Sequence, residues 1–222
     1  MPDSRPQTAE DHYRGGRAEH YEAHHRKNLR TRLTTWRERQ VLVNALRDAG
    51  SPRSALDLPC GTGRFWSAFE RAGVDDLIAG DASEGMLGVA AGNRLGEHLP
   101  SKLIQSSAFA MDLPDDAVDF AACLRFYHHL SRREDRIRLL AELRRVAREY
   151  VAISLWVDGN LGALRRLRRP ARPVEVGYGR RICQRRHDAE AEFREAGFSI
   201  VRHYDVWPLV GMWRMYLLRI DG

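Results

Sequence analysis

Apolar positions along the chain follow two different periods, and the two periods alternate. Short apolar runs, typical of buried strands, are separated by stretches in which apolar residues recur every three or four positions, as in helices. The expected strands are residues 54–58, 75–80, 101–106, 117–123, 150–157, 198–206 and 211–219. The expected helices are residues 64–72, 83–97, 132–149 and 187–196.

This alternation predicts an α/β fold with a doubly wound, mostly parallel seven-stranded sheet of the Rossmann-like kind. The last two strands are separated only by a short stretch around Pro208 and Gly211, too short for a crossover, so we expect an antiparallel C-terminal strand. Ligands bind such sheets beyond the carboxyl ends of the strands. Functional residues are therefore expected just after Leu58, Gly80, Ser106, Cys123 and Val157.

Two segments stand apart from the alternation. Residues 8–48 read as helical up to a turn at Pro52, so residues 1–52 are expected to form an N-terminal helical arm. Residues 53–222 then form the main domain. Within it, the connection at about 158–186 is much longer than usual, and long connections commonly act as lids.

The composition excludes several classes of protein. With 222 residues, 43% hydrophobic and 30% charged, the chain fits one soluble domain with an arm. Neither a transmembrane stretch nor a secretory signal is expected. Three cysteines, Cys60, Cys123 and Cys183, are too few and too far apart for a disulfide framework or a zinc site. We therefore expect a cytoplasmic protein with reduced thiols and no metal.

The net charge of +6 comes from 36 basic and 30 acidic residues, and all the basic residues except Lys27 and Lys102 are arginines. Most arginines are interleaved with acids along the chain. For these, the preference for arginine over lysine is explained by the coding composition of the genome alone. Nine of them, however, lie between Arg165 and Arg186, among leucines in the long connection. That pattern suits an anionic acceptor or a membrane surface, and a solvated loop is the alternative.

A glycine-rich turn follows the first expected strand, in the string from Asp57 to Arg64 (DLPCGTGR). Glycines such as Gly61 and Gly63 allow close approach of a ligand to the backbone. The third glycine of the dinucleotide fingerprint is missing, because Trp66 stands three residues after Gly63. Asp57 would repel a pyrophosphate but could pair with an ammonium group, which favours a ligand with an amino-acid end over NAD.

A second acid follows the second expected strand, in the string from Gly80 to Leu87 (GDASEGML). Asp81 at this strand end could accept hydrogen bonds from both hydroxyls of a ribose. Alternatively, Asp81 or Ser83 could merely cap the next helix.

A third string, Ser107 to Phe120 (SAFAMDLPDDAVDF), continues through Cys123 to Leu130 (CLRFYHHL). In this order, the three strings resemble the class I S-adenosylmethionine-dependent methyltransferases, in particular the small single-domain group of ubiquinone and menaquinone type. The resemblance implies a transferase that uses S-adenosyl-L-methionine as its cofactor and methylates small molecules.

The resemblance also implies roles for individual residues. Asp57 and the glycine turn would hold the methionine end, Asp81 the ribose, and Met86 the adenine. Phe109 stands where the family usually has Asp, so ring packing would replace a carboxylate contact. The arm would cap the active site, with Tyr21 near the sulfonium or the carboxylate of the cofactor. The implied cofactor-binding residues are Tyr21, Asp57, Pro59, Gly61, Gly63, Asp81, Ala82, Met86, Ala108, Phe109, Ala110 and Cys123.

Candidate catalytic residues follow the fourth expected strand. Histidine is a common general base near neutral pH, and we expect His128 to face the pocket while His129 is structural. Alternatively, the pair only fixes the next helix. Arg125 could bind an acidic substrate group or stabilise a developing anion.

We therefore expect methyl transfer to a small or amphiphilic, anionic or neutral acceptor, with oxygen favoured over nitrogen or carbon. The alternatives are an RNA or protein methyltransferase and a non-catalytic S-adenosylmethionine-binding regulatory protein. The expected partners are a small-molecule or lipid-like acceptor and the periphery of a membrane. A nucleic-acid partner is not expected, because aromatic residues are sparse in the long connection. The protein would be a monomer or a homodimer.

Overall fold

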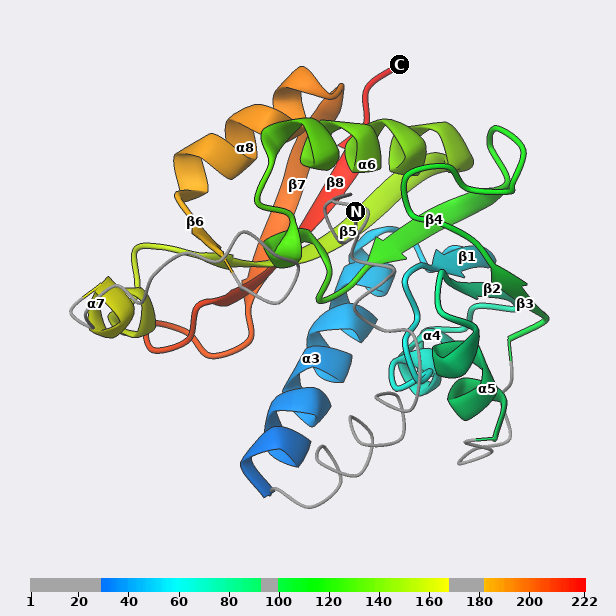
Figure 1. Cartoon of the computed structure of the whole chain (residues 1–222), viewed down its shortest axis with the longest axis horizontal. Coiled ribbons are helices and arrows are strands. Elements are labelled where there is room, and N and C mark those ends of the chain that lie inside the picture. Colours follow the sequence, from blue (N-terminus) through cyan, green and yellow to red (C-terminus); the bar gives the residue numbers. More distant parts are fainter. Residues whose placement is uncertain (1–28, 93–99, 168–181) are drawn as a thin grey trace, which may run out of the picture.

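A computed structural model describes residues 29–92, 100–167 and 182–222 of the chain (Figure 1). The strands are β1 (Ser54–Asp57), β2 (Asp76–Asp81), β3 (Lys102–Gln105), β4 (Val118–Cys123), β5 (Ala147–Val157), β6 (Cys183–Gln184), β7 (Phe198–Asp205) and β8 (Trp213–Ile220). The helices are α3 (Leu29–Asp48), α4 (Trp66–Arg71), α5 (Glu84–Gly92), α6 (Arg133–Val146), α7 (Leu161–Leu167), α8 (Arg186–Glu195) and the 3₁₀ turn η1 (Tyr127–His129).

All eight strands belong to one sheet, in the order β3-β2-β1-β4-β5-β8-β7, with β6 beside β5. The strands β1 to β5 pair in parallel, whereas β8 runs antiparallel to both β5 and β7. The predicted α/β class and the antiparallel C-terminal strand are therefore confirmed. The additional strand β6 has only two residues, too few to produce a periodic pattern in the sequence.

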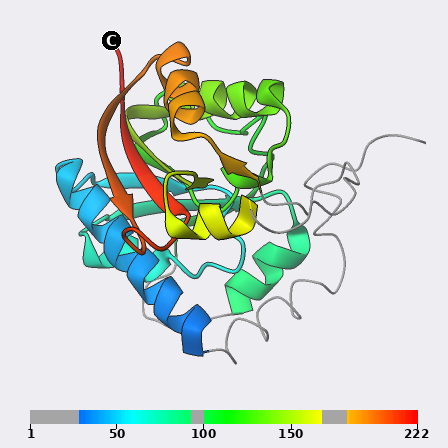
Figure 2. The ribbon, with the colours of Figure 1, turned by 90° about the vertical axis from the view of Figure 1, so that its left-hand side faces the viewer.

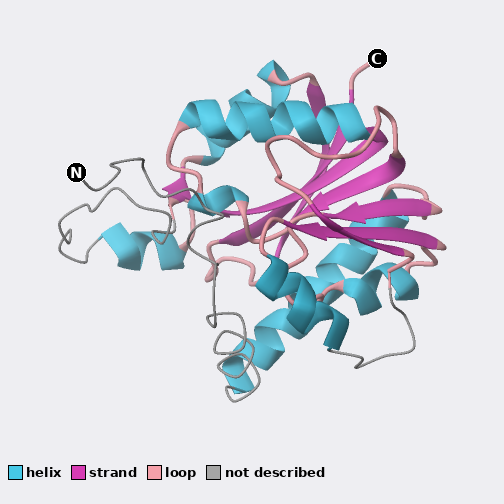
Figure 3. Cartoon of the chain, turned by 45° about the vertical axis from the view of Figure 1, so that its right-hand side comes forward, coloured by secondary structure: helices cyan, strands magenta, loops and turns pink. Residues whose placement is uncertain are grey.

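Helices cover both faces of the sheet (Figure 3). On one face, apolar residues of α6 and α8 such as Leu139 and Phe193 pack over the strands. On the other face, α3, α4 and α5 do the same with residues such as Leu46 and Phe69. The second half of α3 belongs to this core, so residues 41–49 of the expected arm pack directly on the main domain. Among the described residues, no helix has the length and apolar character needed to cross a bilayer.

One boundary differs from the sequence prediction. The helix expected over residues 132–149 ends at Val146, and β5 begins at Ala147 rather than at residue 150. Ala147 pairs with Val118 of β4, so strand pairing overrides the local helical preference of the intervening residues. The expected helical residues 8–28 and 93–97 lie outside the described residues.

Candidate functional site

A pocket of about 810 Å³ opens at the carboxyl ends of β1, β2 and β4, where the strand order reverses. This is the edge at which parallel α/β sheets bind ligands. The wall consists of Pro59, Cys60, Gly61, Arg64, Phe65, Asp81, Ala82, Ser83, Met86, Ser106, Ala108, Phe109, Leu124, Arg125, Phe126 and His129.

The glycine turn after β1 forms the floor of one half of the pocket. Gly61 and Gly63 both have positive φ angles, 55° and 75°. A Cβ at Gly63 would lie 2.8 Å from the ring of Trp66, so a side chain there would have to displace the indole. The backbone N–H of Cys60 donates to the carbonyl of Gly80 at 2.7 Å, which ties the turn to the end of β2.

Asp81, at the end of β2, is nearly buried and lies on the pocket wall. Its Oδ2 accepts a hydrogen bond from the Gly61 N–H and its Oδ1 one from the Ser83 N–H, both at 2.9 Å. The Ser83 hydroxyl in turn accepts from the Met86 N–H at 3.3 Å, so Ser83 caps α5. The Asp81 carboxylate thus ties the glycine turn to the start of α5 and forms part of the pocket wall.

Asp57 is fully buried beneath the turn, at the end of β1. Neither of its carboxylate oxygens has a hydrogen-bond partner among the described residues. Burial, together with the charge of Asp81, raises its pKa to about 8, and the nearby Trp66 and Arg64 offset only part of this rise. A buried acid without a partner is costly, and a cationic group placed beside it would restore its charged form.

The structure places most of the predicted cofactor residues around the pocket. Those on the wall are Pro59, Gly61, Asp81, Ala82, Met86, Ala108 and Phe109. Those off the wall are Asp57 beneath the turn, Gly63 within the turn, Cys123 in the core and the exposed Ala110. Tyr21 lies outside the described residues. Phe109 stands with its ring centroid 5.9 Å from that of Phe126, so it forms an aromatic side of the pocket.

The two histidines are placed the other way round from the sequence prediction. His129 lies on the pocket wall, whereas His128 is 1% exposed. The His128 ring stacks on Trp156, with centroids 5.5 Å apart, and meets the edge of Trp213 at 4.7 Å. The expectation that His128 faces the pocket is therefore wrong, because two tryptophans from β5 and β8 enclose its ring.

Arg125 lies on the pocket wall, as predicted, but its charge is already engaged. Its Nε donates to Oε1 of Glu38 at 2.9 Å, and its Nη2 donates to Oε2 of the same carboxylate. Glu38 comes from α3 and its side chain is only 3% exposed. The Arg125 guanidinium also lies 5.0 Å from the centre of the Trp213 ring. The predicted role of Arg125 in binding an acidic substrate therefore competes with a buried ion pair.

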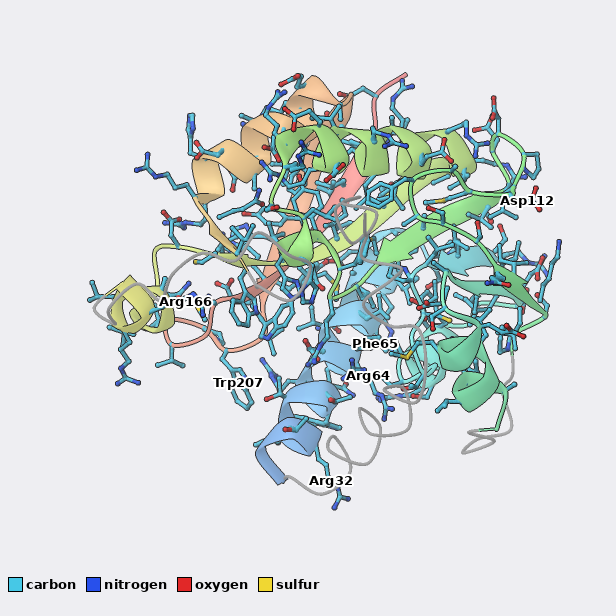
Figure 4. The ribbon with its side chains drawn as sticks, in the orientation of Figure 1. Arg32, Arg64, Phe65, Asp112, Arg166 and Trp207 are labelled. Atoms are coloured by element: carbon cyan, nitrogen blue, oxygen red, sulfur yellow. The ribbon has the colours of Figure 1, made fainter. Side chains whose placement is uncertain are left out.

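The sequence prediction missed several wall residues. Ser106 and Leu124 lie at the ends of β3 and β4, where the strand-end rule predicted functional residues without naming these two as cofactor contacts. Arg64 and Phe65 lie between α3 and α4 (Figure 4). Arg39 of α3 donates through Nε to the Arg64 carbonyl at 2.6 Å, a contact with no local sequence signal. The missed wall residues are Cys60, Arg64, Phe65, Ser83, Ser106, Leu124, Phe126 and His129.

Comparisons with known proteins agree with this site. Residues 56–153 match a family described as a methyltransferase domain, and this range covers the glycine turn, both acids and the exit of β4. No curated protein sequence matches the chain.

Solved structures with the same fold are methyltransferases and related enzymes. A magnesium protoporphyrin IX methyltransferase from Synechocystis, crystallised with S-adenosylhomocysteine, has a TM-score of 0.66 and 18% identity, covering 87% of this chain and 88% of that one. An S-adenosylmethionine-dependent methyltransferase from Clostridium acetobutylicum has a TM-score of 0.72 at 12% identity, covering 92% and 99%. The cyclase SpnF has a TM-score of 0.62 at 17% identity, covering 82% and 80%.

The family match covers the pocket residues of β1, β2 and β4, and the structural matches extend over most of the chain. Residues 56–153 therefore match a methyltransferase-domain family, and the chain has the fold of solved S-adenosylmethionine-dependent methyltransferases.

Proposed function

We propose that the chain transfers a methyl group from S-adenosylmethionine to a small or amphiphilic acceptor, most readily at oxygen. The observation that carries the proposal is the fully buried Asp57 carboxylate, which has no partner among the described residues and lies beneath the glycine turn of the pocket. The methionine end of the cofactor carries an ammonium group, which fits this acid.

The remaining wall residues suit the rest of the cofactor. Asp81 places a carboxylate on the wall at the end of β2, which suits ribose hydroxyls, and Ala82 lies on the wall beside it. Met86, Ala108 and Phe109 offer an apolar surface for an adenine ring. When bound, the cofactor supplies an electrophilic methyl group on a sulfonium.

The other half of the pocket is largely apolar and aromatic. Phe65, Leu124 and Phe126 line it, and His129 contributes an imidazole ring. An acceptor with an apolar body fits these side chains, and His129 in place of His128 is positioned to remove a proton from an acceptor hydroxyl. Arg64 adds positive charge to the same wall, which suits an acceptor with an anionic group.

The proposed arm gains support from α3. Two consecutive residues of this helix, Glu38 and Arg39, contact the wall residues Arg125 and Arg64. A helix bound to the wall at two points could position the preceding residues as a cap over the pocket. We also place the protein in the cytoplasm, because Cys60, Cys123 and Cys183 are free thiols. We propose a monomer or a homodimer as the active form.

The decisive experiment is a methyl-transfer assay on fractionated metabolite and lipid extracts. The purified chain is incubated with S-adenosylmethionine, and each fraction is analysed by mass spectrometry for products heavier by about 14 Da, the mass of one methyl replacing one hydrogen. S-adenosylhomocysteine release is measured in parallel. The Asp81→Ala variant is the matched control, because it should lose both signals.

Three outcomes would contradict the proposal. Methyl incorporation into RNA or protein alone would make the chain a polymer methyltransferase. Cofactor binding without S-adenosylhomocysteine release in any fraction would make it a non-catalytic binding protein. A product that forms only in the presence of the chain, but whose mass has not increased by one methyl group, would point to another reaction on this fold.

A further inference from the structure

One face of the molecule exposes apolar side chains together with arginines. We call it the apolar–arginine face, and three segments form it: the first half of α3, α7, and the loop between β7 and β8 (residues 206–212). Six of the eight large hydrophobic side chains that are exposed among the described residues lie on it. They are Leu33 and Trp36 of α3, Leu161 and Leu164 of α7, and Leu209 and Val210 of the loop. Its arginines are Arg32, Arg37, Arg165 and Arg166.

The three segments form one continuous surface. The N–H of Leu161 donates to the carbonyl of Leu209 at 2.9 Å, which joins α7 to the loop. Arg37 donates through Nε to the carbonyl of Val206 at 3.3 Å, which joins α3 to the loop. Figure 2 looks onto this side of the molecule, with α3, the loop and α7 side by side. Figure 4 shows Arg32, Trp207 and Arg166 spread along it.

The charge of the face has a single sign. Residues 29–37, 161–167 and 206–212 contain arginines but neither Asp nor Glu. The next acid along α3, Glu38, is buried against Arg125 and contributes no exposed negative charge. Arg32, Arg165 and Arg166 are exposed beside the exposed leucines. The face therefore complements a surface that is negatively charged outside and apolar beneath.

Leu209 has a conformation that folding alone does not explain. Its φ angle is 65°, in the left-handed region that glycine and asparagine adopt readily and a bulky residue does not. Its side chain is 81% exposed, so contacts within the described chain do not compensate for the strained backbone. Glycine would be the favoured residue for the fold at this position. A leucine there points to a role outside the folded chain.

We propose that the apolar–arginine face docks on the surface of an anionic phospholipid bilayer. Leu209, Val210 and Trp36 enter the boundary between headgroups and acyl chains, where tryptophan is enriched. The arginines contact lipid phosphates. Nucleic acid fits less well, because exposed leucines gain nothing from a phosphate backbone. Docking does not depend on methyl transfer. If the proposed function holds, docking would bring the pocket close to a source of amphiphilic acceptors.

The test is binding of the full chain to vesicles, measured by co-sedimentation and by tryptophan fluorescence. Vesicles of phosphatidylcholine alone are compared with vesicles in which a third of the lipid is phosphatidylglycerol. We expect at least about tenfold tighter binding to the anionic vesicles, because each arginine near such a surface contributes about a fivefold gain. Equal binding to both vesicles, or none to either, would overturn the proposal.

Two double variants separate a local effect from net charge. Arg165→Gln with Arg166→Gln should weaken binding to anionic vesicles by roughly twentyfold. Arg53→Gln with Arg219→Gln removes the same charge from the opposite edge of the sheet, where Arg53 precedes β1 and Arg219 lies near the end of β8. This control should bind within about twofold of the unmodified chain. Equal losses in both variants would show that net charge, and not this face, attracts the vesicles.

Leu209→Gly provides the sharpest variant, because it separates docking from folding. Glycine relieves the left-handed backbone, so the melting temperature should stay equal or rise. Vesicle binding should nevertheless fall several-fold, since the most exposed apolar side chain is gone. A lower melting temperature would show that Leu209 serves the fold. RNA binding that persists in this variant, or a solution dimer that only this variant abolishes, would assign the face to another partner and overturn the proposal.

Discussion

The two halves of the pocket are held in place by contacts of very different range. In the cofactor half, the turn at Gly61 and the acid Asp81 bond to each other across adjacent strands, and the residues involved lie within one short stretch of chain. In the acceptor half, Arg125 is held by Glu38, 87 residues earlier in the sequence. Behind this wall, the buried His128 next to His129 is held by two tryptophans of β5 and β8.

The two halves also differ in how their charges are balanced. The cofactor half contains an acid, Asp57, whose oxygens accept no hydrogen bond from the described residues, so a cationic ligand group beside it would stabilise its charged form. The acceptor half balances its buried charge internally through Glu38 and Arg125. In the proposed function, the first half recognises the ammonium group of the cofactor and the second recognises the body of the acceptor.

The largest expected effect is on the acceptor half. Glu38→Ala should lower the free energy of unfolding by about 3–5 kcal/mol, because it leaves the Arg125 charge buried without its partner. Urea denaturation followed by circular dichroism measures this. Asp48→Ala, which removes an exposed acid from the same helix, should cost less than about 1 kcal/mol. Similar losses in both variants would mean that the long-range ion pair does not hold this half together.

The next effect is on the cofactor half. Asp81→Ala removes the acceptor of two backbone N–H bonds and the proposed ribose partner, so the Kd for S-adenosylhomocysteine should rise by roughly 150-fold, or about 3 kcal/mol. Isothermal titration calorimetry gives this value directly. Asp76→Ala, at the other end of the same strand, is the control and should bind normally. Unchanged affinity in the Asp81 variant would show that Asp81 does not bind the cofactor.

The histidine pair tests which side chain serves the acceptor. His129→Ala should lower kcat by roughly 100-fold while leaving the melting temperature near that of the unmodified chain. His128→Phe keeps an aromatic ring between Trp156 and Trp213 and should retain most of the activity. Both variants are assayed with the acceptor found in the extract screen. Loss of activity in the His128 variant, with activity retained in the His129 variant, would identify His128 as the general base.

The smallest effect is the pH dependence that Asp57 imposes. Its pKa of about 8 in the free protein means that a proton must leave before the carboxylate can pair with an ammonium group. Cofactor affinity should therefore rise by up to about tenfold per pH unit as the pH increases toward 8. Calorimetry at several pH values measures the slope. Asp57→Asn should bind more weakly and with a flat profile, so an unchanged slope in this variant would contradict the assignment.

The same raised pKa predicts the pH dependence of stability in the free protein. Between pH 4 and 8, folded Asp57 holds a proton that the unfolded chain has lost, so the free energy of unfolding should fall as the pH rises through this window. Asp57→Asn should remove that decline. A wild-type chain that gains stability over the same range, without a matching change in the variant, would show that another group dominates.

What the sequence could predict follows the same division between the halves. The glycine turn and Asp81 are local features whose meaning depends only on neighbouring strands, and the strand periods place them correctly at the carboxyl edge. The orientation of the histidines depends on Trp156 and Trp213, which are far away in the sequence. The same holds for the pairing of Arg125 with Glu38. Such contacts leave no periodic or motif signal, so the acceptor half was only partly predictable.

The apolar–arginine face shows the same limit. The sequence drew attention to the arginines of the long connection, of which the structure describes α7 and the residues from 182 onward. It gave no reason to join them with α3 or with the loop at Leu209, because only the tertiary structure brings these segments together. The strand β6 within the connection was likewise too short to detect.

The position of β8 in the sheet has a consequence for biosynthesis. This strand follows the other described strands in the sequence, yet it lies between β5 and β7 rather than at an edge. Until its residues leave the ribosome, β5 and β7 each present an unpaired edge, which invites pairing with other nascent chains. A stop codon at position 213 would leave residues 56–153 intact but remove β8 and open the sheet in its middle. We expect such a product to be retained by chaperones or degraded.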